Sequence, residues 1–116
     1  MTSGPDDFLD VEGFFRYRLA IGTVIRAERN PKARVPAYVL TVDFGPWGQK
    51  TSSAQLTRRY RPHDLEGRQV VGVLNFPVKR IAGVASEVLI LGGVPAPGDV
   101  VLLAPDARVP DGTPVA

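Results

Sequence analysis

The sequence predicts an all-β domain with small helical content, and two observations carry that prediction. Short apolar runs rich in β-branched residues recur at residues 37–44, 70–74 and 88–91, and runs of this length favour strands. Glycine and proline, with twelve and eleven residues, supply turn signals between the runs. The chain has 116 residues, so residues 1–116 are expected to form a single domain.

The first 15 residues are expected to form a helical arm. Gly4-Pro5-Asp6-Asp7 places proline at a first helical position and acidic residues in the first turn, where they suit the positive end of a helix dipole. Residues 8–12 continue for one or two amphipathic turns, which are marginal in isolation. The arm must therefore dock on the barrel or on a second subunit through its apolar side chains, among them Phe8, Leu9 and Phe14.

Three strands are predicted in the first half of the chain. Residues 17–27 alternate, and one face of this strand carries Tyr17, Leu19, Ile21 and Ile25. Gly22 on the other face suggests a bend or bulge. A loop over residues 30–36 carries two charges between two prolines. The second strand, over residues 37–44, directs one face inward, with Tyr38, Leu40, Val42 and Phe44. Residues 50–53 form the third strand.

A helix and two further strands complete the predicted barrel. The helix is expected over residues 54–60, with Ser53 as its N-cap. Residues 70–74 suit a strand buried on both faces. Phe76-Pro77 then turns the chain, because proline has no N–H for a sheet ladder. Lys79 and Arg80 are expected at the tip of this excursion, and residues 88–91 return as a strand.

This order of three strands, a helix and two strands is the plan of a five-stranded OB-fold barrel with a helix between strands 3 and 4. The curved face and adjoining loops of such barrels bind oligonucleotides. Gly92-Gly93 is predicted to be a turn and residues 100–103 an extra strand. Residues 104–116 form a C-terminal tail, which is too rich in proline and glycine to pack as a regular element.

The charges are distributed unevenly along the chain. Between Arg16 and Arg80 lie thirteen of the fourteen basic residues and four of the twelve acidic ones, a balance of +9, although the whole chain carries only +2. A positive central body with acidic ends is expected for a protein with a polyanionic partner. Ordinary solvated barrel surface is the alternative.

Several classes of function are excluded or disfavoured by composition. The chain has no cysteine and one histidine, His63, so thiolate metal sites and zinc motifs are ruled out. Ser52, Ser53 and Ser86 have no nucleophile elbow and no evident base. No phosphate-binding glycine motif is present. We expect no catalysis, no metal, no cofactor and no membrane insertion, and a cytoplasmic location.

A family resemblance is carried by the stretch NFPVKRIAGVASEVLILG, which begins at Asn75. It resembles the segment NFPP, a basic pair and SEVLVLG of the CsaA proteins, bacterial relatives of the tRNA-binding domain of some methionyl-tRNA synthetases. FLDVEGFF, NPKARVPAYVLTVDFG, TSSAQLTRRY and VPDGTPV also have counterparts in the same order. Departures occur at Arg18, Ala20, Val35 and Val78.

The resemblance implies a homodimer that binds tRNA. The RNA-facing positions of the relatives correspond here to Lys50, Ser53, Asn75, Lys79, Arg80, Ser86 and Glu87. Lys79 and Arg80 would hold phosphates, and the polar residues would contact base edges in unpaired RNA. The resemblance also leaves open a second function, a chaperone-like binder of unfolded or pre-secretory polypeptides that assists protein export. Its dimer or peptide-binding surface would include Phe8, Leu9 and Phe14.

Overall fold

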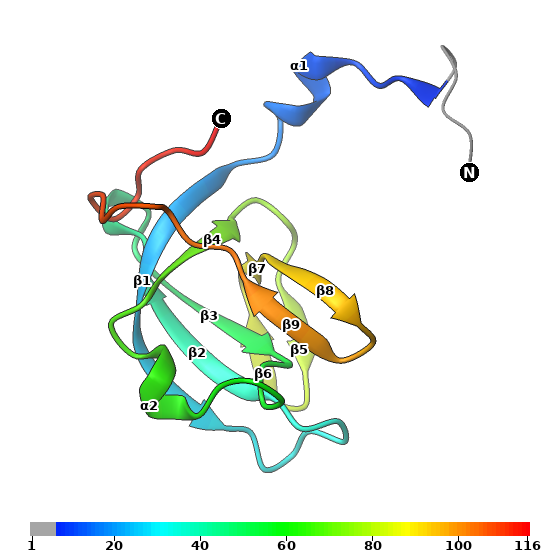
Figure 1. Ribbon diagram of the computed structural model, residues 1–116, viewed down its shortest axis with the longest axis vertical. Helices are drawn as coiled ribbons and strands as arrows, with labels where there is room; N and C mark the ends of the chain where they lie inside the picture. The colour runs from blue at the N-terminus through cyan, green and yellow to red at the C-terminus, as the bar shows by residue number, and fades with distance from the viewer. Residues whose placement is uncertain (1–6) are drawn as a thin grey trace.

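A computed structural model describes residues 7–116, and its centre is a nearly closed antiparallel barrel sheet (Figure 1). The sheet order is β3-β2-β1-β4-β7. These strands are β1 (Leu19–Arg29), β2 (Tyr38–Asp43), β3 (Gln49–Ala54), β4 (Gln69–Val73) and β7 (Leu89–Ile90). The predicted all-β, five-stranded OB-like barrel is confirmed.

β1 is the central strand, and it serves two partners. Its first half pairs with β4, from Leu19 opposite Val73 to Thr23 opposite Gln69. Its second half, from Thr23 to Arg29, pairs with β2, and the register shifts between Val24 and Arg26 within this pairing. The bulge thus lies at Ile25 and not at Gly22, and it lets one strand turn the corner between two parts of the barrel.

The face of β1 that was expected to carry Tyr17, Leu19, Ile21 and Ile25 is only partly buried, since Ile21 is 6% exposed but Ile25 is 42% exposed. The core cluster takes the small side chains of Ala20, Val24 and Ala27 from this strand. Phe44, at the end of β2, occupies the space above β1, and a Cβ built on Gly22 would lie 2.7 Å from its ring. The core face of β1 is therefore small because its neighbour is large.

The β2 prediction is confirmed, since Tyr38, Leu40, Val42 and Phe44 are all at most 1% exposed. The helix prediction is wrong in position. Residues 54–60 form no helix, and α2 (Pro62–Leu65) follows them. Proline suits the first helical position, and the Asp64 carboxylate accepts the backbone N–H of Arg61 at 2.9 Å. Ser53 belongs to β3 and caps no helix.

The chain beyond β4 forms two hairpins. β5 (Lys79–Ile81) pairs with β6 (Val84–Ser86) around a turn at Ala82 and Gly83. Lys79 and Arg80 therefore lie on strand β5. The prediction that they lie at the tip is wrong. β8 (Gly92–Ala96) pairs with β9 (Asp99–Leu102). The extra strand is thus confirmed, but its partner begins at the glycine pair that was predicted to be a turn.

The C-terminal tail is irregular, as predicted, yet it docks on its own barrel. The Ile21 backbone N–H donates to the Thr113 carbonyl at 2.9 Å, and the Gly112 N–H donates to the Ile21 carbonyl at 2.7 Å. The Asp111 carboxylate accepts the Thr23 hydroxyl at 2.5 Å. Figure 1 shows this tail running along the start of β1. The tail covers the edge of β1 that β2 leaves unpaired.

The N-terminal arm begins its helix later than predicted, and the motif at residues 4–6 lies outside the described residues. α1 (Val11–Phe14) is capped by Asp10, whose carboxylate accepts the Glu12 N–H at 3.2 Å. None of the residues of α1 is buried. In Figure 1 the arm extends away from the barrel, and Phe8 and Leu9 are 74% and 93% exposed. No docking of the arm on its own barrel is seen within residues 7–116.

Candidate nucleic-acid interface

A groove of about 590 Å³ lies between β3 and the β5–β6 hairpin. We call it the β3–β6 groove. Four of the predicted site residues line it, namely Ser53, Lys79, Ser86 and Glu87. Its apolar lining includes Leu56, Phe76, Pro77, Ile81, Val88, Leu89 and Val100. A groove with a cationic rim and an apolar floor can hold a charged backbone and stack bases.

Lys79 and Arg80 are both exposed and neither is neutralised. The ion pairs in the structure are Arg26–Glu28, Arg59–Asp99 and His63–Asp64, and neither Lys79 nor Arg80 has an acidic partner within residues 7–116. Because side chains alternate along a strand, Lys79 lines the β3–β6 groove and Arg80 lies on the other face of β5. The Arg80 guanidinium donates to the Gly83 carbonyl at 3.4 Å.

Ser53, Ser86 and Glu87 close the barrel between β3 and β6. The Thr51 N–H donates to the Glu87 carboxylate at 3.0 Å, and the Glu87 N–H donates to the Thr51 carbonyl at 2.8 Å. The Ser53 N–H donates to the Ser86 hydroxyl at 3.2 Å. The backbone hydrogen bond from Thr51 lowers the pKa of Glu87 most, and the half-buried Lys50 lowers it further. We call this joint, in which Thr51 and Ser53 of β3 bond to Ser86 and Glu87, the seam.

Asn75 lies away from the other predicted site residues. Its side-chain oxygen accepts the Arg18 N–H and its amide donates to the Arg16 carbonyl, both at 2.8 Å. Asn75 therefore fixes the chain between α1 and β1. It lines a second groove of about 650 Å³, the arm groove, together with Leu9, Asp10, Gly13, Phe14, Arg16, Tyr17 and Phe76. Phe76 is shared by both grooves, whereas Phe8 lines neither.

Two basic residues outside the set predicted from the sequence lie beside the β5–β6 hairpin. Lys32 and Arg34, in the loop of residues 30–36, line a hollow of about 370 Å³ with Ser53, Gln55, Ile81 and Ala82. The signal was present in the sequence as two charges between two prolines. Its significance could not be seen without the fold, because residues 30–36 and 79–86 are far apart in the chain.

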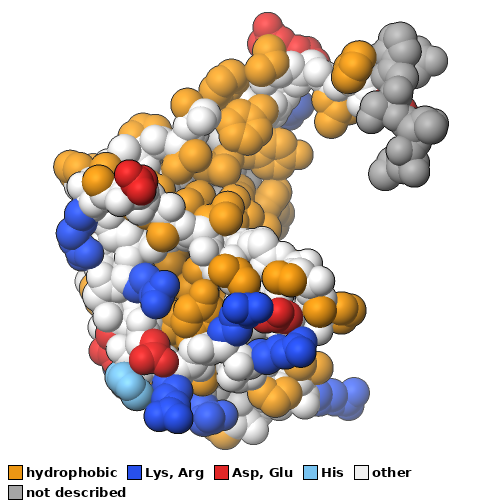
Figure 2. All heavy atoms as spheres, viewed as in Figure 1, with side chains coloured by type: hydrophobic (Ala, Val, Ile, Leu, Met, Phe, Trp, Pro, Cys, Tyr) orange, Lys and Arg blue, Asp and Glu red, His pale blue; other side chains and the backbone are white. Residues whose placement is uncertain are grey.

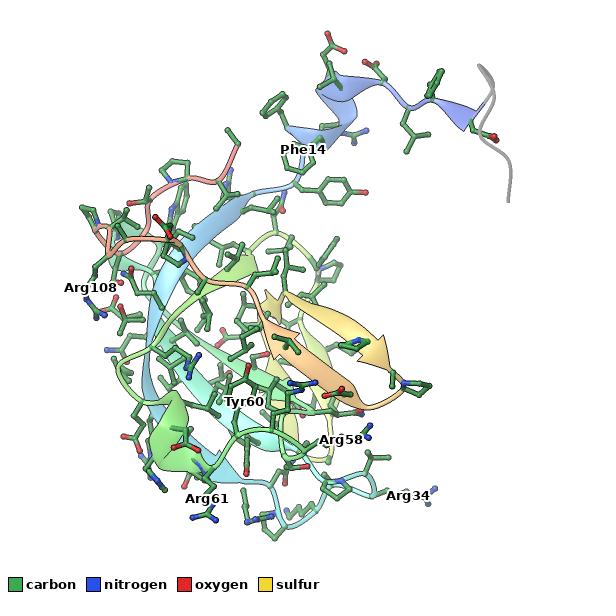
Figure 3. All side chains as sticks on the ribbon, in the orientation of Figure 1. Phe14, Arg34, Arg58, Tyr60, Arg61 and Arg108 are labelled. Atoms are coloured by element: carbon green, nitrogen blue, oxygen red, sulfur yellow. The ribbon has the colours of Figure 1, made fainter. Side chains whose placement is uncertain are left out.

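The two ends of the molecule differ in chemistry. Figure 2 shows hydrophobic side chains over the arm and the adjoining barrel, while many of the visible Lys and Arg side chains gather toward the other end. In Figure 3, Phe14 lies on the arm and Arg34, Arg58 and Arg61 lie at the opposite end. Among residues 7–116, no group of three His, Asp or Glu side chains could hold a metal ion.

A model of the putative tRNA binding domain family matches residues 19–114. The chain belongs to this tRNA-binding domain family. Within it, the chain resembles CsaA proteins. The crystal structure of chaperone CsaA from Bacillus anthracis str. Ames is 55% identical, with a TM-score of 0.90 over 94% of this chain and 99% of that one. CsaA chaperone protein from Picrophilus torridus is 34% identical, with a TM-score of 0.86 over 94% and 100%.

This tRNA-binding domain also recurs in longer proteins. The methionine–tRNA ligase of Methanothrix thermoacetophila is 40% identical over 81% of this chain, and that of Porphyromonas gingivalis is 32% identical over 90%. The chain spans only about 14–15% of the length of these ligases. No helix within residues 7–116 is long and apolar enough to cross a membrane.

Proposed function

We propose that this chain is a non-catalytic tRNA-binding protein that grips RNA at the β3–β6 groove. The observation that carries the proposal is the unneutralised lysine at the rim of an apolar groove, on a domain of the tRNA-binding family. Lys79, Arg80 and Lys50 would supply phosphate contacts, which give affinity without sequence information. The Ser86 hydroxyl accepts one hydrogen bond and can donate its own proton to RNA.

Asn75 and Glu87 have a double role in this proposal. Both side chains already hold backbone, Asn75 at residues 16–18 and Glu87 at Thr51. Each retains hydrogen-bonding capacity, because an amide has a second N–H and a carboxylate has a second oxygen. Asn75 lies in the arm groove, and the ring of Phe76 lines both this groove and the β3–β6 groove. An RNA bound in the β3–β6 groove would therefore pass Phe76 to reach Asn75.

The experiment is a salt-titrated measurement of tRNA affinity. Lys79→Ala/Arg80→Ala should weaken binding about 10- to 100-fold at low salt and flatten the dependence of log K on log salt by up to about two contacts. Arg26→Ala/Arg108→Ala removes the same charge away from the grooves and is the matched control. Unchanged tRNA affinity in the Lys79/Arg80 variant would refute the site.

A second candidate function is capture of unfolded polypeptides, and one observation favours it. The arm groove is lined by Leu9, Phe14, Tyr17 and Phe76, and the arm carries several further exposed large hydrophobic side chains. Contiguous exposed apolar surface marks interaction sites. Two structural relatives are named as CsaA chaperones. The same surface could pair with a second copy of the chain. Apolar binding should hardly respond to salt, so salt-insensitive binding of an unfolded polypeptide without any tRNA affinity would favour this function.

A further inference from the structure

The buried side chain of Asn30 ties two basic segments together. Asn30 is 8% exposed and stands at the start of the loop of residues 30–36. Its side-chain oxygen accepts the Lys32 N–H at 3.1 Å, which shapes the loop. Its amide donates to the Ala82 carbonyl at 3.3 Å, across 52 residues of sequence. The loop is thereby fixed to the turn of the β5–β6 hairpin.

Two cations converge on that turn. The Lys32 side chain lies over Gly83, since a Cβ built there would be 3.5 Å from Lys32 Cδ and 3.8 Å from Nζ. The Arg80 guanidinium donates to the Gly83 carbonyl at 3.4 Å. Neither has an acidic partner within residues 7–116. The two positive charges repel each other, but the hydrogen bond between Asn30 and Ala82 holds their two segments together. An anion bound between Lys32 and Arg80 would relieve this repulsion.

The turn itself is held in an unusual conformation. Ala82 has φ 48°, a left-handed value that alanine adopts at an energetic cost, and Gly83 follows with φ 82°. The Asn30 amide bonds the carbonyl of this strained residue. Strain of this kind is retained where the surrounding contacts over-determine it, and it gathers at binding sites.

We propose that Lys32 and Arg80 hold one phosphate of the RNA backbone at the Ala82–Gly83 turn, and that Asn30 is the positioning residue that brings them together. The proposal rests on the proposed tRNA-binding function for its biological ligand. The phosphate-binding chemistry itself does not depend on that function. The site adjoins the β3–β6 groove, because Ile81 of the same hairpin lines both the groove and the loop hollow.

The first test is a titration with inorganic phosphate, followed by the backbone amide resonances of Lys32 and Gly83. The wild type should give saturable shifts at both residues. Lys32→Ala/Arg80→Ala changes two exposed side chains and should abolish them, whereas Arg26→Ala/Arg108→Ala should not. No saturable shift at Gly83 in the wild type, or an equal shift in the Lys32/Arg80 variant, would overturn the site.

The second test isolates Asn30. Asn30→Ser keeps an oxygen that can accept the Lys32 N–H but is too short to reach Ala82. It should weaken tRNA binding about 3- to 10-fold and lower the salt slope by about one phosphate contact. Adding Asn30→Ser to Lys32→Ala/Arg80→Ala should cause no further loss. Independent, additive losses would mean that Asn30 supports only the fold, and would overturn its positioning role.

These outcomes separate the two proposals. Phosphate binding at Gly83 without any tRNA affinity would refute the proposed function and leave the anion site standing. Strong tRNA binding with an unchanged salt slope in both the Asn30 and Lys32/Arg80 variants would refute the anion site and the phosphate contact of Arg80, and would leave tRNA binding itself standing. A thermal unfolding midpoint measured for each variant confirms that folded protein is being compared.

Discussion

At the scale of single residues, the core is organised around Phe44. Its ring is fully buried, and the positions that face it on β1 and β4 are glycines, since a Cβ on Gly22 or Gly72 would lie 2.7 Å from its ring atoms. The alternation in residues 37–44 predicts the buried ring correctly. It does not predict which face of β1 is buried, because Ala20 and Gly22 carry almost no hydrophobic signal.

Gly22→Ala should destabilise the protein by about 1–3 kcal/mol, the usual range for overpacking a core. The added methyl would also lie 2.8 Å from the Asp43 carbonyl, which cannot move without disturbing the β1–β2 pairing. Urea unfolding of both variants measures the change. Gly13→Ala is the control, because nothing lies within 4 Å of a Cβ at Gly13. An unchanged midpoint for Gly22→Ala would contradict this account of the core.

A substitution at Ala82, in the turn of the β5–β6 hairpin, should stabilise the protein. Asn followed by Gly is the preferred pair for a two-residue turn with positive φ at both positions. Ala82→Asn should therefore stabilise the protein by about 0.5–1 kcal/mol, which is a rise of roughly 2–4 °C in the unfolding midpoint. Ala82→Val, with a branched side chain at φ 48°, should lower it. A lower midpoint for the Asn variant would show that the turn is not strained.

At the scale of elements, the errors of sequence-based prediction have identifiable causes. The apolar and basic pattern of residues 54–60 resembles that of a helix, but Tyr60 is held by tertiary hydrogen bonds instead. Its hydroxyl accepts the Leu102 N–H, and its backbone carbonyl accepts the Tyr38 hydroxyl. The sequence predicts Lys79 and Arg80 at the tip, and not the real turn at Ala82 and Gly83, because an alanine at the first turn position gives no turn signal. The strands at 70–74 and 88–91 were predictable because their apolar runs are unambiguous.

The seam predicts a specific dependence on pH. The fold lowers the pKa of Glu87, mainly through the Thr51 N–H. Its stabilising effect is therefore complete above the ordinary carboxyl pKa of about 4.3 and is lost as pH falls through the lowered folded value. Glu87→Gln should lose less stability than the wild type on acidification from pH 6 to pH 3. Parallel curves of unfolding free energy against pH for the two proteins would contradict this role.

At the scale of the whole molecule, the tail completes the barrel. Its backbone bonds to Leu19 and Ile21 and the Asp111 contacts with Thr23 and Gln69 cover an edge that would otherwise attract other strands. The sequence predicts that the tail is irregular but not where it lies. Its docking depends on contacts of residues 109–115 with residues 19–23 and with Gln69, and no local pattern in the sequence predicts them.

Removal of residues 106–116 removes eight hydrogen bonds to the barrel. At roughly 0.5–1 kcal/mol for each, it should cost about 4–8 kcal/mol, and it should promote aggregation. Urea unfolding and light scattering measure the two effects. Removal of the exposed Ala116 alone should leave both unchanged. Full stability in the longer truncation would show that the tail adds nothing to the barrel.

The distribution of charge is the other property of the whole molecule. The excess of basic residues between Arg16 and Arg80 predicts a polyanionic partner, but it cannot say which face that partner meets. The face that we propose for it is the one on which the fold brings Lys32 and Arg34 beside the hairpin that carries Lys79 and Arg80. The arm carries exposed apolar side chains, while many of the visible Lys and Arg side chains gather toward the other end of the molecule (Figure 2).

The seam has one more consequence for the folded protein. The other strand pairs of the barrel are joined by regular backbone ladders, but β3 and β6 are joined largely by side-chain hydrogen bonds. Local opening of the barrel should therefore occur most readily between these two strands. The β3–β6 groove lies over that joint. A bound RNA that contacts both sides of the seam would disfavour this local opening. Added RNA should therefore slow hydrogen exchange at the Thr51 amide and raise the thermal unfolding midpoint of the protein.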